Sequence, residues 1–235
     1  MTWSILARDP ATGILGVAVA SRFFAVGAIC PHVEGGIAAL ATQALVNPMY
    51  AVQAMPRLRT GENPASVLAS LVSPDPGADQ RQFHILDASG RIAHHTGTNC
   101  VDWAGHASAE NVSVAGNMLA GEATVRATLD AYLSAAGSME ERLLTAMEAG
   151  EKAGGDKRGK QSAAMKIAGR DPYPDLDIRA DDHPDPLAEL RRLYRVSLER
   201  YAVFRRFLPS ADSEWGTFDR VVIDATITRD RIPPQ

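Results

Sequence analysis

The stretch that decides the fold is TWSILARDPATGILGVAVAS, which occupies residues 2–21. In its first part Trp3, Ile5 and Ala7 alternate onto one face, as they do in a β-strand that begins at Thr2. Turn-forming residues follow at 9–13, and residues 14–21 read as a second strand that is apolar on both faces. The pattern predicts a β-hairpin whose second strand is covered on both sides.

Working outward from this hairpin, strands alternate with helices along the rest of the chain. We expect strands at 37–44, 82–87, 91–96, 112–115, 162–168, 176–180 and 220–227, and an irregular segment at 23–36. Helical periodicity predicts helices at 48–60, 64–71, 138–149 and 185–208, and a further helix after Gly121. Two sheets with helices on their outer faces fit this order of elements.

The composition is that of an ordinary globular protein and excludes several function classes. The 235 residues are 46% hydrophobic and 22% charged, with a net charge of −4, so neither nucleic acid nor a membrane is expected as a partner. No segment has the length of a membrane span or the pattern of a secretory signal. Two cysteines, Cys30 and Cys100, are too few for a disulfide framework.

We therefore expect a cytoplasmic protein that acts on a small molecule and uses no cofactor. One domain is predicted over residues 1–210, followed by a C-terminal extension over 211–235. This extension and the exposed arginines of the preceding helix favour a homodimer.

The pair Met1-Thr2 carries the first chemical signal. If the methionine is trimmed, Thr2 has a free α-amine beside its own hydroxyl. An α-amine has a pKa of about 7.7–8.0, so it can take the hydroxyl proton near neutral pH. Threonine with its own amine is a known form of nucleophilic catalysis, and a strand that begins at the same residue would hold it rigidly.

The chain resembles a bacterial family known as domain of unknown function 1028, from residue 2 to about residue 193. The matching stretches are residues 7–10, 17–27, 41–44, 47–48, 116–119, 154–159, 161–164 and 181–186. More loosely, the first 45 or so residues resemble the N-terminal nucleophile hydrolases, the class of the proteasome β subunits. These resemblances imply an α+β fold, a four-layer αββα sandwich of two mainly antiparallel sheets.

The resemblance to the proteasome has one departure. In that pattern an aspartate precedes the Ser-Arg pair and helps to set a catalytic lysine. Here Ala20 precedes Ser21 and Arg22, and residues 31–35 contain no lysine. The fold therefore carries over more readily than the charge network does, with His32 or Arg22 as substitutes for the cation.

The loop at 154–162 and the Gly116-Asn117 pair supply the other candidate groups. An Asn117 amide could donate to an oxyanion, or it could cap the following helix or turn. Arg158 suits a carboxylate-bearing substrate, or it pairs with Asp156 on a solvated turn. The expected catalytic residues are Thr2, Ser21, Asn117, Asp156 and Ser162, and the expected substrate-binding residues are Arg22, Gln43 and Arg158.

Three functions follow from these residues. The first is hydrolysis of a C–N amide bond in a small anionic substrate, with Thr2 as the nucleophile. The second is small-molecule binding on the same scaffold without turnover. The third is a metal-dependent hydrolase that uses His94, Asp182 and His183. We expect no metal, because adjacent residues of a strand, such as His94 and His95, point to opposite faces.

Overall fold

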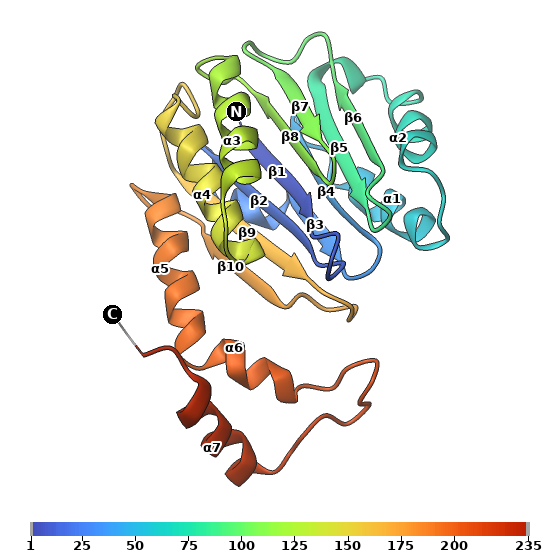
Figure 1. Ribbon diagram of the computed structural model, residues 1–235. Coiled ribbons are helices and arrows are strands. Elements are labelled where there is room, and N and C mark those ends of the chain that lie inside the picture. Colours follow the sequence, from blue (N-terminus) through green and yellow to red (C-terminus); the bar gives the residue numbers. More distant parts are fainter. Residues whose placement is uncertain (1, 234–235) are drawn as a thin grey trace.

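The computed structural model describes residues 2–233, and it has four layers of secondary structure (Figure 1). Its strands are β1 (Thr2–Arg8), β2 (Leu15–Ser21), β3 (Pro31–Glu34), β4 (Ala38–Ala44), β5 (Arg81–Asp87), β6 (Ile92–Thr96), β7 (Gly105–Ala109), β8 (Val112–Asn117), β9 (Ser162–Ala168) and β10 (Leu176–Ala180). Its helices are α1 (Met49–Arg59), α2 (Pro64–Val72), α3 (Glu122–Ser134), α4 (Met139–Lys152), α5 (Pro186–Glu199), α6 (Tyr201–Phe204) and α7 (Arg220–Asp230).

The strands form two antiparallel sheets that lie face to face. The first sheet has six strands in the order β10-β9-β2-β1-β8-β7, and the second has four in the order β3-β4-β5-β6. The hairpin of β1 and β2 lies at the centre of the six-stranded sheet, where Thr2 pairs with Ser21 on one side and with Asn117 on the other. This central position follows from the strong apolar pattern of residues 2–21, because a central strand is covered on both faces.

Three apolar cores hold the layers together. One lies between the six-stranded sheet and helices α3, α4 and α5, and it contains Trp3 and Ile5. A second lies between the four-stranded sheet and helices α1 and α2. The third lies between the two sheets, where Leu15, Val17 and Val19 of β2 contact β4. The predicted α+β four-layer sandwich is confirmed by this arrangement.

Local signals explain where helices α2, α4 and α5 begin. Asn63 accepts a hydrogen bond from the N–H of Ala65 at the start of α2, and Pro64 occupies the first helical position. Ser138 and Glu141 form the expected capping box at the start of α4. Asp185 caps α5 by accepting from the N–H of Ala188.

The structure corrects four of the predicted elements. The segment at 23–36, expected to be irregular, contains strand β3, and strand β7 was not predicted at all. The long helix expected at 185–208 breaks at Arg200, whose φ of −147° is not helical, and α6 begins at the next residue. Residues 220–227, predicted as a strand, belong to helix α7.

The error at α7 has a clear physical reason. The β-branched residues at 221–223 favour a strand, but tertiary packing overrides this preference. Asp219 caps the helix by accepting from the N–H groups of Val221 and Val222. Ile223 and Ile227 are four residues apart, on one helix face, where they pack with Val203 and Phe207 in a small separate core. The domain boundary predicted after residue 210 stays a prediction.

Among residues 2–233, no helix is both long enough and apolar enough to cross a membrane.

Candidate active site

Thr2 lies at the buried end of β1, with its side chain directed between the two sheets. Only 6% of the residue is exposed. Its hydroxyl Oγ1 is 3.1 Å from the hydroxyl of Ser21, which faces it across the β1–β2 pair. Since successive side chains of a strand point to opposite faces, Thr2, Ser4 and Leu6 face the second sheet, and Trp3, Ile5 and Ala7 face the helices.

A small cavity of about 50 Å³ opens beside Thr2. Its volume is enough for one or two water molecules, which each occupy about 30 Å³ in the liquid. Besides Thr2, it is lined by Phe23, Val26, Ile29, Cys30, Thr42, Gln43, Ala44 and Val46. None of these residues carries a formal charge at neutral pH, because burial raises the pKa of the Cys30 thiol and keeps it protonated.

Left-handed backbone conformations occur in the cavity wall, next to it, and at the end of β8. Ala25, Ala44 and Met118 have φ values of 50°, 68° and 59°, in the left-handed region that residues with a Cβ atom rarely adopt. Ala44 lines the cavity, Ala25 precedes the lining residue Val26, and Met118 follows Asn117. Such conformations cost about 1–3 kcal/mol each and tend to occur at functional sites.

A network of buried amides lies between the sheets behind Thr2, with Gln82 of β5 at its centre. The Gln82 Oε1 atom accepts from Gln43 Nε2 at 2.7 Å and from Asn117 Nδ2 at 3.1 Å. The Gln82 Nε2 atom donates to the carbonyl oxygens of Gly105 and Gly116 at 3.0 and 2.8 Å. Because carbonyl oxygens only accept, they fix the orientation of the Gln82 amide.

Because the Gln82 Oε1 atom is an acceptor, the side-chain amides of Asn117 and Gln43 must both point their nitrogen atoms toward it. Asn117 Nδ2 donates to the Thr2 carbonyl at 3.3 Å as well as to Gln82. Gln43 Nε2 donates to the Ala115 carbonyl at 3.1 Å as well as to Gln82. Each amide nitrogen has two protons, so both are fully used in these contacts. The oxyanion role of Asn117 and the substrate-binding role of Gln43 stay predictions, and the observed contacts are those of positioning residues.

The sequence analysis missed a second part of this network, which includes His84 of β5. Ser4 Oγ donates to Gln43 Oε1 at 2.8 Å, so its contact with His84 Nε2 at 2.9 Å requires a proton on that ring nitrogen. His84 Nδ1 then accepts from Ser113 Oγ at 2.9 Å. Burial is the main cause that lowers the pKa of His84 to about 3, so the ring is neutral.

A signal for these residues exists in the alternation of β5. Gln82 and His84 are polar and alternate with Phe83 and Ile85. This pattern normally describes a strand with one face in solvent. Only the position of the second sheet shows that the polar face is buried as completely as the apolar face.

Asp156 connects the loop at 154–162 to the end of β2. Its buried carboxylate accepts from the backbone N–H of Arg22 at 2.7 Å and from that of Arg158 at 2.8 Å. The Arg158 guanidinium forms an ion pair with the same carboxylate at 3.2 Å. The Arg22 guanidinium donates to the Lys160 carbonyl. The expected group of Arg22, Asp156 and Arg158 is therefore brought together, beside Ser21.

Ser162 lies next to Ser21 in the β2–β9 pair, and its hydroxyl is used by the backbone. The hydroxyl donates to the Phe23 carbonyl and accepts from the Val26 N–H at 3.1 Å. Phe23 and Val26 both line the cavity, so Ser162 fixes one of its walls.

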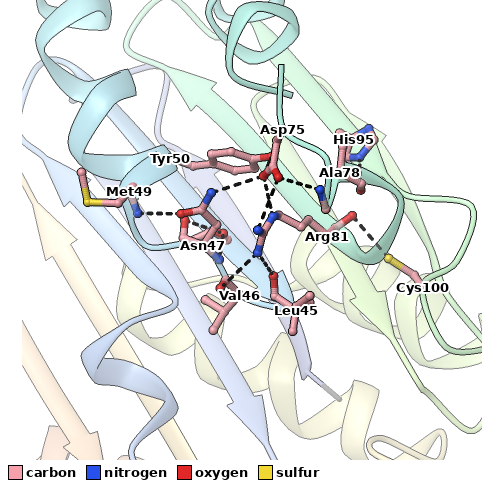
Figure 2. A network of polar contacts seen from close by, with 12 residues as sticks. Leu45, Val46, Asn47, Met49, Tyr50, Asp75, Ala78, Arg81, His95 and Cys100 are labelled. Atoms are coloured by element: carbon pink, nitrogen blue, oxygen red, sulfur yellow. Dashed lines mark hydrogen bonds and ion pairs between the residues drawn. The ribbon is translucent and has the colours of Figure 1, made fainter. Parts of the chain in front are cut away.

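A partly buried ion pair supports the turn after β4 (Figure 2). Asp75 accepts from Arg81 Nε and from the Tyr50 hydroxyl, each at 2.6 Å, and these contacts hold the pKa of Asp75 well below its usual range. Arg81 also donates to the carbonyl of Leu45 at 2.7 Å. The network thereby fixes the turn after β4, which includes the lining residue Val46.

Among residues 2–233, no three histidine, cysteine, aspartate or glutamate side chains gather as a metal site. His94 instead lies against His106 of β7, with ring centroids 3.4 Å apart. Asp182 accepts from Gln161, and His183 Nδ1 accepts from the N–H of Asp185.

Fold and site together define a class of protein: a four-layer αββα sandwich that presents a buried threonine hydroxyl at the end of a central strand. Within this class, the chain belongs to the family of unknown function DUF1028, whose family model matches residues 2–190. The resemblance to this family found in the sequence is confirmed.

One solved structure has the same fold, and two others are similar to the chain at a much lower level. The crystal structure of protein SPO2555 from Silicibacter pomeroyi, described by the same family model, is 31% identical to the chain, with a TM-score of 0.87 over 93% of this chain and 96% of that one. Anbu (ancestral beta-subunit) from Yersinia bercovieri is 12% identical, with a TM-score of 0.40 over 83% of this chain and 94% of its own. An Anbu (Gly-1) mutant from Hyphomicrobium sp. strain MC1 is 13% identical, with a TM-score of 0.43 over 86% and 96%. No curated protein matches the chain.

Proposed function

We propose that this protein is an N-terminal nucleophile amidohydrolase that cleaves a small amide, with Thr2 as the nucleophile. The observation that carries the proposal is the placement of the Thr2 hydroxyl at the buried end of a central strand, 3.1 Å from Ser21 and beside a cavity. A nucleophile must be held rigidly where a substrate can reach it; the central strand supports the first requirement and the adjoining cavity supports the second.

The chemistry needs Thr2 to carry a free α-amine. The amine takes the proton of Oγ1, and Oγ1 attacks the amide carbonyl carbon to form a tetrahedral intermediate. The C–N bond then breaks, the leaving amine takes up a proton, and the acyl group stays on Oγ1 as an ester. Water hydrolyses this ester, which releases a carboxylic acid and restores the hydroxyl.

The neighbouring residues have supporting roles in this proposal. Ser21 hydrogen-bonds the nucleophile, Asn117 holds the Thr2 carbonyl, and Ser162 fixes the wall at Phe23 and Val26. The uncharged cavity of about 50 Å³ suits a small acyl group.

Two arginines near the end of β2 support an anionic substrate. Arg22 follows Ser21 directly, and its guanidinium donates to the Lys160 carbonyl. The Arg158 guanidinium pairs with Asp156, whose carboxylate also accepts from the Arg22 backbone N–H. In this proposal a substrate carboxylate binds one of these guanidinium groups.

The test is to determine the mass of the mature N-terminus and to assay a panel of small amides. Wild type should lack Met1, form an acyl adduct on the Thr2 peptide and turn over at least one amide. Thr2→Ala should lose the adduct and the turnover. The matched control is Thr12→Ala, which removes a hydroxyl from the exposed turn after β1 and should keep both. Turnover by protein that retains Met1, or by Thr2→Ala, contradicts the proposal.

A non-catalytic binding protein is the second candidate. The observation in its favour is the absence of any charged side chain among the lining residues of the described cavity, since a general base or a cation is common beside a nucleophile. This function predicts that small anionic amides raise the melting temperature of wild type and of Thr2→Ala equally, without product.

A further inference from the structure

Large apolar side chains are exposed on the segment that follows α6. We call residues 208–233 the C-terminal arm, and Figure 1 shows it standing off the four-layer body. Trp215, Phe218 and Val221 are 75%, 86% and 79% exposed, and Val222 is exposed as well. Ordered proteins rarely leave such side chains together in solvent unless a partner covers them.

The arm is fastened to the body, so its apolar side chains are held outward. The Tyr173 hydroxyl donates to the Pro209 carbonyl, and the Ala211 N–H donates to Asp171 at 2.8 Å. The Thr217 N–H donates to the Phe207 carbonyl at 2.9 Å. The small core of Val203, Phe207, Ile223 and Ile227 uses the other face of α7. The exposed residues are therefore those that remain after the arm has made its own contacts.

An apolar groove of about 780 Å³ lies at the base of the arm, between β10 and helices α5 and α6. Strand β10 is the edge of the six-stranded sheet, and the outer helix face supplies Val196, Tyr201 and Phe204. Each of these three side chains is partly exposed. Neither Trp215 nor Phe218 is among the residues that line the groove, so the arm does not fill the groove of its own chain.

We propose that the arm of one chain docks in the groove of a second copy, so that two chains form a dimer by reciprocal exchange. One chain carries both the apolar arm and the apolar groove. A two-fold axis lets both arms and both grooves be covered at once, and the assembly closes at two copies. The partner is therefore this same chain.

The area available matches that of a stable dimer. Buried aromatic side chains each cover about 150–250 Å², so Trp215 and Phe218 of two arms bury roughly 600–1,000 Å². The two grooves bury a comparable area against them, which gives a total of about 1,200–2,000 Å². Stable specific interfaces have this size. A single arm in a single groove would bury half as much, so the reciprocal arrangement is needed.

The experiment measures the mass of the full chain by analytical ultracentrifugation from low to high micromolar concentration. Wild type should have twice the 25.1 kDa mass of one chain. The arm variant with Trp215→Ser and Phe218→Ser, and the groove variant Val196→Glu, should each raise the dissociation constant about tenfold or more. Leu133→Ser on α3 and Val52→Glu on α1 are matched exposed controls and should leave it unchanged.

Mixing the two variants separates reciprocal exchange from any other dimer. The arm variant keeps its groove and the groove variant keeps its arm, so the mixture regains one arm–groove contact, and heterodimers should form more tightly than either homodimer. A wild-type monomer at every concentration overturns the proposal. A dimer that survives both variants, or a mixture no tighter than the separate variants, also overturns it.

Discussion

The two faces of strand β1 are both buried, but at Ser4 and Ile5 they differ in chemistry, whereas Leu6 joins the apolar core between the sheets. Ile5 and Ser4 are adjacent, and each is 0% exposed. Ile5 packs among apolar residues of α3 and α4, whereas Ser4 hydrogen-bonds Gln43 and His84 of the opposite sheet. The same strand therefore has one face stabilised by non-directional apolar burial and one face on which the Thr2–Ser4 end is stabilised by directional hydrogen bonds.

This difference explains how the protein presents Thr2. An apolar layer tolerates exchange of one hydrophobic residue for another, since the contacts are non-directional. A layer of satisfied amides specifies one arrangement, because each lost partner leaves a buried polar group unpaired. Thr2 lies on the directional face, where its carbonyl is held by Asn117 and its hydroxyl meets Ser21.

The largest effect is expected at the centre of the polar face. Gln82→Leu removes the acceptor of Gln43 and Asn117 and the donor to the carbonyls of Gly105 and Gly116. Each unpaired buried group costs about 1–3 kcal/mol, so the free energy of unfolding should fall by about 4 kcal/mol or more. Urea unfolding measures this, with Gln53→Leu on the exposed face of α1 as control. If Gln82→Leu lowers the free energy of unfolding by less than the deletion of one buried methyl group would, the network contributes little to stability.

A smaller loss of stability is expected at Ser4, the neighbour of Ile5 on β1. Ser4→Ala removes the donor to Gln43 Oε1 and the acceptor of His84 Nε2, and should cost about 2 kcal/mol. Ser108→Ala, an exposed serine of β7, is the control and should cost almost nothing. If both substitutions are neutral in urea unfolding, the two faces of β1 do not differ as described.

The polar face should also make stability depend on pH. The pKa of folded His84 is held at about 3, mainly by burial, whereas in the unfolded chain it is about 6.5. As pH falls below 6.5 the unfolded state takes up a proton that the folded state does not, so stability is lost progressively toward pH 3. Between pH 6.5 and 5 the loss should be on the order of 2 kcal/mol. His84→Gln should reduce the slope without abolishing it, because the pKa of His106 is also lowered, to about 4, and those of His94 and His32 are lowered by burial. An unchanged slope in His84→Gln would assign the whole effect to these other groups.

The smallest effect is expected on the apolar face. Ile5→Val removes one methylene from a well-packed site and should cost about 1 kcal/mol. This loss should be the same at pH 5 and pH 7, because burial raises the pKa of the two tyrosines of that core, Tyr132 and Tyr194, above its ordinary value, and both stay neutral at these pH values. If Ile5→Val lowers the free energy of unfolding more than Ser4→Ala does, the apolar face is the more sensitive one and the comparison between the two faces is reversed.

Much of the fold was predictable because it depends on local patterns. The alternation of Trp3, Ile5 and Ala7, the turn at 9–13 and the capping box at Ser138 each specify an element without distant contacts. Strand β7 was missed because Gly105–Ala109 is short and weakly apolar, and it is recognisable only through its pairing with β8. Helix α7 was misassigned because its partner, α6, supplies the packing that decides its state.

The residues of the candidate site also fall into two groups, those that the sequence could predict and those that it could not. Thr2, Ser21, Asp156 and Ser162 could be selected from motifs, and the structure gathers them at one end of the six-stranded sheet. Gln82, His84 and Ser4 could not, since a polar residue in an alternating strand normally faces solvent.

By itself, the sequence determined the strand that begins at Thr2, the hairpin that follows and the order of the layers, because hydrophobic periodicity and turn residues act over a few neighbouring positions. Only the tertiary structure decided that the polar face of β1 is buried against a second polar face. Hydrogen-bond partners such as Ser4 and His84 lie 80 positions apart, so nothing local to either residue reveals the pair. The identity of a buried polar partner depends on how two sheets stack, and that is a property of the whole chain.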